Sequence, residues 1–238
     1  MFQGFIGGMW MLLRKWDDIP EFMRNDEVKK YYDILIKKRF SLMLKRFFDI
    51  IMSLLLLIVL SPAFLILAIW IKVDSQGTVF YRQERITQYG RTFRIFKFRT
   101  MVSNADKIGT LVTTQNDSRI TRVGEKIRKC RLDEIPQLIN ILKGDMSFVG
   151  TRPEVQKYVD AYTNEMKATL LLPAGVTSLA SLKYRDEDEI ISQETDRGKT
   201  IDQAYIEDVL PEKMKFNLEY LDNFNILKDV NLCVKTVI

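Results

Sequence analysis

Two adjacent acids, Asp133 and Glu134, are the side chains in this sequence whose type and position best suit chemistry. They start a segment with apolar residues at helical spacing, in which Pro136 falls in the expected first turn and Gly144 is placed to cap the end. For such a pair taken alone, helix capping is the commoner role. The same position favours an ionised carboxylate, which a nucleophile or a metal ligand requires, so capping and catalysis are compatible.

Histidine is absent from the 238 residues, which excludes a serine-histidine-aspartate triad, a histidine general base and the commonest zinc sites. The two cysteines, Cys130 and Cys233, lie far apart without metal-ligand spacing and do not resemble a disulfide framework. A reducing cytoplasmic setting is therefore expected. Acid-base or nucleophilic chemistry is left to carboxylates, Lys, Tyr, Ser or Cys.

Basic residues predominate around the acidic pair, and the whole chain has 36 Lys and Arg against 31 Asp and Glu, a formal charge of +5. This balance favours an anionic partner: a phosphate substrate, an anionic lipid surface or a nucleic acid. Arginine forks match phosphate oxygens and stabilise the charge of phosphoryl transfer, although a solvated basic surface would give a similar pattern. A turn at 150–154 presents Arg152 together with Glu154. The basic residues concerned are Lys97, Arg99, Arg119, Arg122, Arg128, Arg131 and Arg152.

Residues 50–71 form an uncharged apolar run that is long enough to cross a membrane as a helix. Ser61-Pro62 lies in the middle of this run, where the proline predicts a kink or break and the Ser61 hydroxyl is placed to satisfy a freed carbonyl. Basic residues flank the run on both sides, and positive charge marks the cytoplasmic side of a membrane. The pattern favours a re-entrant helix that returns to the same face; a kinked spanning helix and a buried helix of a soluble core are the alternatives.

The remaining segments predict a mainly helical α+β protein. Short strands at 78–83 and 92–98 are expected to pair as a hairpin around Tyr89-Gly90 and to carry Arg94, Lys97 and Arg99 toward a site. The other expected elements are an interfacial segment at 1–13 with Trp10 and Trp16 at headgroup level, a surface helix at 20–40, helices at 123–131 and 132–144, a solvated acidic turn at 186–189 and a final amphipathic helix from 211 to about 232.

Seven short motifs occur in an order that resembles a known family. They are Lys45-Arg46-Phe47-Phe48-Asp49, the apolar run with Ser61-Pro62, Val79-Phe80-Tyr81-Arg82-Gln83-Glu84-Arg85, Phe96-Lys97-Phe98-Arg99-Thr100-Met101, Leu132-Asp133-Glu134-Ile135-Pro136-Gln137-Leu138, Lys143-Gly144-Asp145-Met146-Ser147 and Gly150-Thr151-Arg152-Pro153-Glu154. Together they resemble the bacterial sugar transferase family, the monotopic phosphoglycosyl transferases. The resemblance is strong over 45–154 and looser elsewhere.

This resemblance implies a two-step reaction at the cytoplasmic face of the bacterial inner membrane. The carboxylate matching Asp133 would attack the sugar-bearing phosphate of a UDP-sugar, release UMP and hold the phospho-sugar covalently. Polyprenol phosphate, usually undecaprenyl phosphate, would then accept it, and the residue matching Glu134 would bind Mg²⁺. The expected phosphate- and substrate-binding residues are Lys97, Arg99, Arg128, Arg152 and Glu154, and Ser61-Pro62 would form the re-entrant break.

The expected organisation is an N-terminal interfacial and helical segment at 1–44, a re-entrant membrane helix at 45–73 and a cytosolic catalytic domain at 74–238 with short strands and amphipathic interfacial helices. A nucleic-acid partner is not expected, and homo-oligomerisation is left open. The chain departs from the family at Thr151, where many members have proline, and at 173–178, so the resemblance does not identify the sugar. Two alternatives are a non-enzymatic basic membrane-associated binding protein and a membrane phosphohydrolase that uses Asp133 with water.

Overall fold

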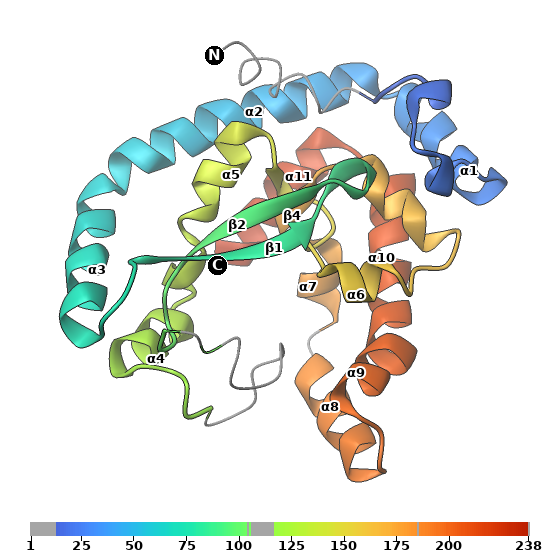
Figure 1. Cartoon of the computed structure of the whole chain (residues 1–238). Coiled ribbons are helices and arrows are strands. Elements are labelled where there is room, and N and C mark those ends of the chain that lie inside the picture. Colours follow the sequence, from blue (N-terminus) through green and yellow to red (C-terminus); the bar gives the residue numbers. More distant parts are fainter. Residues whose placement is uncertain (1–12, 104, 106–116, 185, 238) are drawn as a thin grey trace.

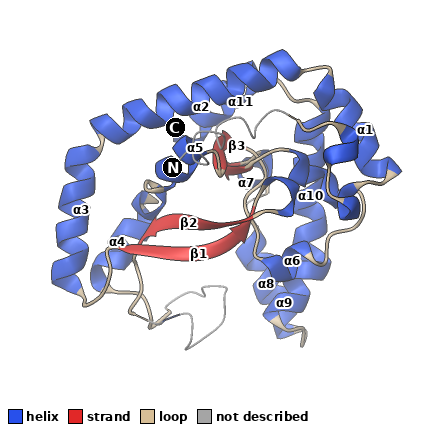
Figure 2. Ribbon diagram, turned by 45° about the horizontal axis from the view of Figure 1, so that its top comes forward, coloured by secondary structure: helices blue, strands red, loops and turns tan. Residues whose placement is uncertain are grey.

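A computed structural model describes residues 13–103, 105, 117–184 and 186–237. Helices α2 and α3 form an arch around one side of the molecule, a β-hairpin lies in the middle, and helices α8 to α10 lie on the opposite side (Figure 1). The strands are few and short among the helices (Figure 2). The predicted α+β class with mainly helical content is confirmed, while most of the predicted interfacial segment at 1–13, including Trp10, lies outside the described residues.

The arch consists of α2 (Arg39–Val59) and α3 (Ser61–Asp74), which are bent by 61° at a one-residue break. Pro62 lies in the first turn of α3, where its missing N–H costs no helical hydrogen bond. The Ser61 hydroxyl donates to the carbonyl of Ile58 at 2.8 Å. The predicted break and the predicted role of Ser61 are thus confirmed. Within the described residues no single helix has the length and apolar character of a membrane span, whereas α2 and α3 have both when taken together.

The inner face of α2 is polar although the helix is apolar overall. Lys45 pairs with Asp229 at 2.5 Å, and both side chains are buried. Arg46 donates to the carbonyl of Ile141 at 2.7 Å, and Asp49 accepts the backbone N–H of Phe148 at 3.1 Å. Since buried charges are tolerated only when paired, these contacts fix the orientation of α2 against the elements below it.

The outer face of the arch carries large exposed apolar side chains. Their exposed fractions reach 71% at Phe40, 66% at Ile58 and 81% at Val73. A water-soluble monomer rarely leaves an apolar patch of this extent uncovered. The other members are Met43, Leu44, Phe47, Ile51, Leu54, Leu55, Val59, Leu65, Ile66, Ile69 and Trp70.

The hairpin pairs β1 (Phe80–Ile86) with β2 (Thr92–Phe98) in antiparallel register, as predicted, although β1 begins and ends later than expected. Tyr89 and Gly90 form the turn with positive φ values of 60° and 72°. A second sheet, which the sequence did not predict, pairs β3 (Met146–Val149) and β4 (Ala174–Thr177) in parallel.

Helix α4 (Arg122–Lys129) agrees with the predicted helix at 123–131. Gly124 lets α4 approach the backbone that follows β2, because a Cβ there would lie 2.0 Å from the carbonyl oxygen of Thr100. The predicted single helix at 132–144 is wrong at its start, since a 3-10 turn (Leu132–Glu134) precedes α5 (Gln137–Lys143). Gly144 ends α5 with φ 83°, which confirms the predicted cap.

The C-terminal part consists of helices that enclose a core shared with α1 (Asp26–Ile36). Helix α1 lies within the predicted helix at 20–40 but is shorter at both ends. Trp16 packs against Tyr32 of α1 at 5.2 Å between ring centroids rather than standing apart from the core. The predicted final helix is wrong: it is divided into α10 (Leu210–Asp222) and α11 (Ile226–Val237). The other helices here are α6 (Gln156–Val159), α7 (Leu179–Lys183), α8 (Glu187–Asp196) and α9 (Ile201–Ala204).

Candidate active site

A cleft of about 1110 Å³ brings most of the predicted site residues together. It extends from the C-terminal end of α2 to the helices of the opposite side. Strand β2 supplies one of these residues, α4 and the turn after it supply three, and the segment after β3 supplies two. The predicted residues on its walls are Lys97, Arg128, Asp133, Glu134, Arg152 and Glu154.

The acidic pair reaches the cleft because the chain turns sharply between α4 and α5. Arg131 adopts φ 53°, a left-handed conformation that ends α4 and starts the 3-10 turn. Neither Asp133 nor Glu134 caps α5, whose N-cap is Pro136 and has no side-chain cap. The capping interpretation of the pair is therefore wrong, and both side chains line the cleft instead.

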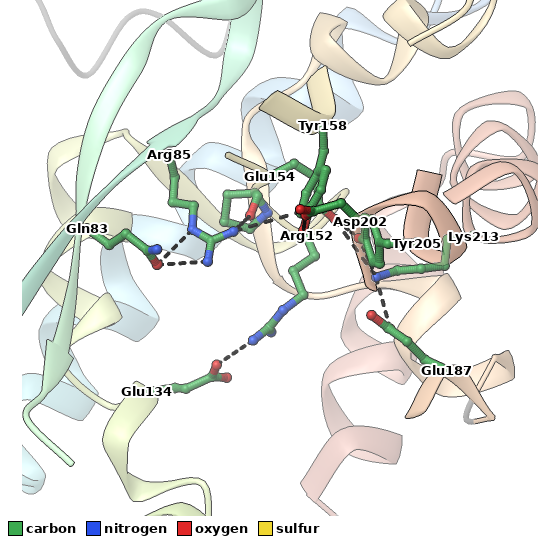
Figure 3. Close-up of polar contacts among 11 residues, drawn as sticks. Gln83, Arg85, Glu134, Arg152, Glu154, Tyr158, Glu187, Asp202, Tyr205 and Lys213 are labelled. Carbon is green, nitrogen blue, oxygen red and sulfur yellow. Dashed lines mark hydrogen bonds and ion pairs between the residues drawn. The ribbon is translucent and has the colours of Figure 1, made fainter. Parts of the chain in front are cut away.

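Glu134 pairs with two basic side chains through one carboxylate oxygen. Its Oε1 accepts from Lys97 Nζ at 3.1 Å and from Arg152 Nη2 at 2.7 Å, and Figure 3 shows Arg152 reaching across to it. Burial alone would raise the pKa of Glu134, but Arg152 and Lys97 outweigh it and hold the pKa at about 2. In return, Glu134 raises the pKa of Arg152. Glu134 is thus a firmly ionised carboxylate that fixes two cations at the cleft.

Asp133 has no hydrogen bond or ion pair from its carboxylate to another residue in the described part of the chain. Burial raises its pKa above the ordinary value; Lys97 and Arg128 act in the opposite direction, and Glu134 adds to the rise. Burial thus acts against the effect that was expected from the position of Asp133 at a helix start, which was to favour the ionised form. The side chain lines the cleft without a partner, between cations that favour its charged form.

Arg99 does not line the cleft, so the structure does not bring it together with the other predicted substrate-binding residues. Its guanidinium donates to the carbonyl of Ser75 at 2.7 Å and to the carbonyl of Gln76, and only 6% of the residue is exposed. It follows the last residue of β2 and turns back to the loop after α3. Arg99 thus ties the end of the arch to the hairpin. Arg94, also expected to point toward a site, pairs with Glu84 at the exposed surface.

Glu154 is buried in a second polar cluster at the far side of the cleft. It accepts from the Tyr205 hydroxyl at 2.5 Å, and Lys213 Nζ lies 3.8 Å away (Figure 3). Lys213 also pairs with Glu187 at 3.0 Å, which corrects the prediction of a merely solvated turn at 186–189. Arg85 lies 3.9 Å from Glu154. The cluster surrounds Glu154 with the Tyr205 hydroxyl and the cations Arg85 and Lys213, and it joins Glu154 to the helices of this wall.

Sequence reasoning missed several residues of the cleft. Arg85 stands at the end of one of the recognised motifs, which was a usable signal. No local pattern marks the contributions of α8 to α11, because helices distant in sequence bring these residues together. The missed wall residues include Leu56, Leu60, Tyr158, Tyr184, Glu187, Tyr205, Lys213 and Lys235.

The cleft has an apolar wall near the arch. Leu56 of α2 and Leu60 at the break contribute to it, and both pack against a cluster that includes Leu138. The opposite wall is polar and holds the Glu154 cluster. Asp133 is thus in a cleft that can accommodate a charged head and an apolar tail at once.

The residues present suit Mg²⁺ only together with a phosphate ligand. Within the described ranges, no group of three acidic or cysteine side chains could hold an ion alone. Mg²⁺ is usually held by one or two carboxylates, water and substrate phosphates, and Glu134 offers one ionised carboxylate whose Oε2 has no hydrogen bond to a described residue. This donor set fits a substrate-borne magnesium ion.

The model of the family described as "Bacterial sugar transferase" matches residues 40–238, so this chain belongs to the bacterial sugar transferase family. The match includes all but the first residue of the arch and all residues of the cleft. The names of similar proteins describe transferases and a protein of exopolysaccharide production.

Three relatives illustrate the similarity. The "UDP-N-acetylgalactosamine-undecaprenyl-phosphate N-acetylgalactosaminephosphotransferase" of Aeromonas hydrophila is 34% identical over 74% of this chain and 38% of its own length. The "Exopolysaccharide production protein ExoY" of Sinorhizobium fredii is 33% identical over 74% of this chain and 76% of its own length. The "UDP-glucose:undecaprenyl-phosphate glucose-1-phosphate transferase" of Escherichia coli is 32% identical over 74% of this chain and 36% of its own length. The chain therefore spans less than half of the Aeromonas and Escherichia relatives.

Proposed function

We propose that this protein transfers a sugar 1-phosphate from a UDP-sugar to polyprenol phosphate, through a covalent intermediate on Asp133. The observation that carries the proposal is the unpaired Asp133 carboxylate in a cleft beside Lys97 and Arg128. The names of relatives support the substrate class, because two of them specify a sugar nucleotide and undecaprenyl phosphate. The lipid-linked sugar diphosphate that results would start glycan assembly.

In the first step, a carboxylate oxygen of Asp133 attacks the sugar-bearing phosphorus of the donor. The bond between this phosphorus and the oxygen of UMP breaks, and UMP leaves with the electron pair. Lys97 and Arg128 lie where they can stabilise the negative charge of the transferring group. In the second step, a phosphate oxygen of polyprenol phosphate attacks the same phosphorus and releases the Asp133 carboxylate.

Glu134 is the residue that would hold Mg²⁺, which would neutralise charge on the donor diphosphate when bound. Its ion pairs with Lys97 and Arg152 hold the carboxylate in one place and keep it ionised. Removal of divalent cations with EDTA should abolish UMP release, and added Mg²⁺ should restore it. Full activity in excess EDTA would contradict this role of Glu134.

The arch is the proposed membrane element. Its outer face is apolar and its inner face is polar, so α2 and α3 would enter one leaflet, bend at Ser61-Pro62 and return to the cytoplasmic side. The cleft reaches Leu56 of α2 and Leu60 at the break, which would place the reacting groups next to the lipid acceptor. Cysteine labelling from each side of the membrane tests this topology: residues 74 and onward must be labelled only from the cytoplasmic side.

The activity test uses the purified chain in detergent with Mg²⁺, a polyprenyl phosphate and a panel of UDP-sugars. Release of UMP with formation of a lipid-linked sugar diphosphate is the expected result for at least one sugar. Release of free sugar phosphate without need of the lipid would instead indicate a hydrolase. Absence of UMP with every donor would contradict the proposed function.

A further inference from the structure

The last turn of α11 adds a cation to the cleft. Lys235 lines the cleft beside Thr236, and the Thr236 hydroxyl lies 2.9 Å from the Thr177 hydroxyl at the end of β4. Farther back on the same helix, the buried pair of Lys45 and Asp229 fastens α11 to α2. The position of Lys235 is therefore set by contacts at two points of its helix.

Most cations of the cleft already have acidic partners. Lys97 and Arg152 pair with Glu134, and Lys213 pairs with Glu187. Lys235 is exposed and has no ion pair with any residue in the described ranges. Its charge is thus available to a ligand, and a lysine held at a cavity wall without a carboxylate partner suits a phosphate.

Arg128 and Arg131 also line the cleft without an ion pair to a described residue. They lie at the end of α4 beside Asp133. Lys235 stands on a different wall, formed by α11 and β4. The cleft consequently offers two separate places for phosphate groups. A reaction that joins two phosphate-bearing substrates needs two such places.

The wall that carries Lys235 is the wall nearest the membrane arch. Val176, next to Thr177, packs with the same apolar cluster as Leu56 of α2 and Leu60 at the break. The outer side of α11 continues this apolar character, with Leu227 75% exposed and Val234 49% exposed. A ligand that reaches Lys235 from this side would have an apolar body and an anionic end.

We propose that Lys235 binds the phosphate of the polyprenyl phosphate acceptor. This inference rests on the proposed function and adds to it a residue for the second substrate. The lipid tail lies along the apolar wall at Leu56, Leu60 and Val176, and its phosphate is held by Lys235 until it attacks the phospho-sugar on Asp133. Donor phosphates use the separate cations near α4.

The first test is ligand binding by the full chain in detergent, measured by titration calorimetry with farnesyl phosphate, farnesol and inorganic phosphate. Lys235→Ala should weaken farnesyl phosphate binding roughly 10- to 100-fold, the range expected for loss of a charged hydrogen bond. Farnesol binding should not change, and Lys235→Arg should restore most of the affinity. Lys228→Ala is the matched control, because Lys228 is exposed on the same helix but does not line the cleft.

The second test separates the two half-reactions. In Lys235→Ala the burst of UMP in the absence of acceptor should equal that of the wild type, while the KM for polyprenyl phosphate rises at least tenfold. An unchanged KM, an equal effect of Lys228→Ala, a slower acceptor-free burst, or a wild type that does not bind farnesyl phosphate would each overturn the inference. If Lys235-dependent binding is found but no UDP-sugar yields UMP, the proposed function fails while the lipid phosphate site stands.

Discussion

The Glu134→Gln substitution tests the electrostatics of the cleft without changing its shape. In the folded chain the pKa of Glu134 falls from 4.5 to about 2, which at 1.36 kcal/mol per pKa unit corresponds to roughly 3 kcal/mol of stability near neutral pH. The Arg152 side chain is 40% exposed, so solvent screening lowers this to about 2 kcal/mol. Glutamine keeps the shape but leaves Lys97 and Arg152 without a negative partner.

The sign of the pH dependence follows from the lowered pKa. A carboxylate with a depressed folded pKa contributes stability above its unfolded value, and this contribution is lost as pH falls from about 4.5 toward 2. The stability difference between wild type and Glu134→Gln should therefore be about 2 kcal/mol at pH 7, should fall below about pH 4.5 and should approach zero only at about pH 2 and below.

The assay is denaturant unfolding in detergent without substrate, followed by tryptophan fluorescence at several pH values. Glu125→Gln serves as the control, because Glu125 is 62% exposed and pairs with Lys129 one turn away on α4. Its loss should change stability far less than the loss at Glu134, because an exposed ion pair is screened by solvent. A difference for Glu134→Gln that is constant with pH, or no difference at pH 7, would refute the assigned ion pairs.

Three further predictions concern other parts of the molecule. In the pH profile of kcat/KM, the apparent pKa of the acid limb should lie above the ordinary pKa of an aspartate, because burial raises the pKa of Asp133 and the nucleophile must be ionised. An apparent pKa at or below 3.8 would contradict this. Lys45→Ala should cost about 3–5 kcal/mol of unfolding free energy, since it leaves Asp229 buried and uncompensated, and a loss under about 1 kcal/mol would contradict it. Arg99→Gln should lower the unfolding midpoint but leave the KM for UDP-sugar within about twofold, as a residue outside the cleft should; a large KM change with normal stability would restore the original prediction.

The features that sequence predicted correctly depend on local signals. Ser61-Pro62 broke the long apolar run as expected, because proline cannot continue the hydrogen bonding of α2. Gly144 ended α5, because glycine adopts a positive φ without strain. The hairpin around Tyr89-Gly90 was also predicted from its own residues. Each of these depends on residues a few positions apart.

The features that sequence missed depend on packing between distant segments. Nothing near Arg99 indicates that it turns away from the cleft to carbonyls at Ser75 and Gln76. The short parallel strands β3 and β4 pair across a long connection and carry no alternating pattern of useful length. The raised pKa of Asp133 is set by burial, which outweighs the local effect of a helix start.

The central claim is the covalent phospho-sugar on Asp133, and peptide mass spectrometry measures it directly. The purified chain is incubated with Mg²⁺ and its UDP-sugar without lipid, quenched and digested. We expect the peptide that contains Asp133 to gain the mass of one sugar phosphate, to lose it when polyprenyl phosphate is added, and to remain unmodified in Asp133→Asn. Normal turnover by Asp133→Asn, or UMP release with no adduct on this peptide, would contradict the proposed mechanism.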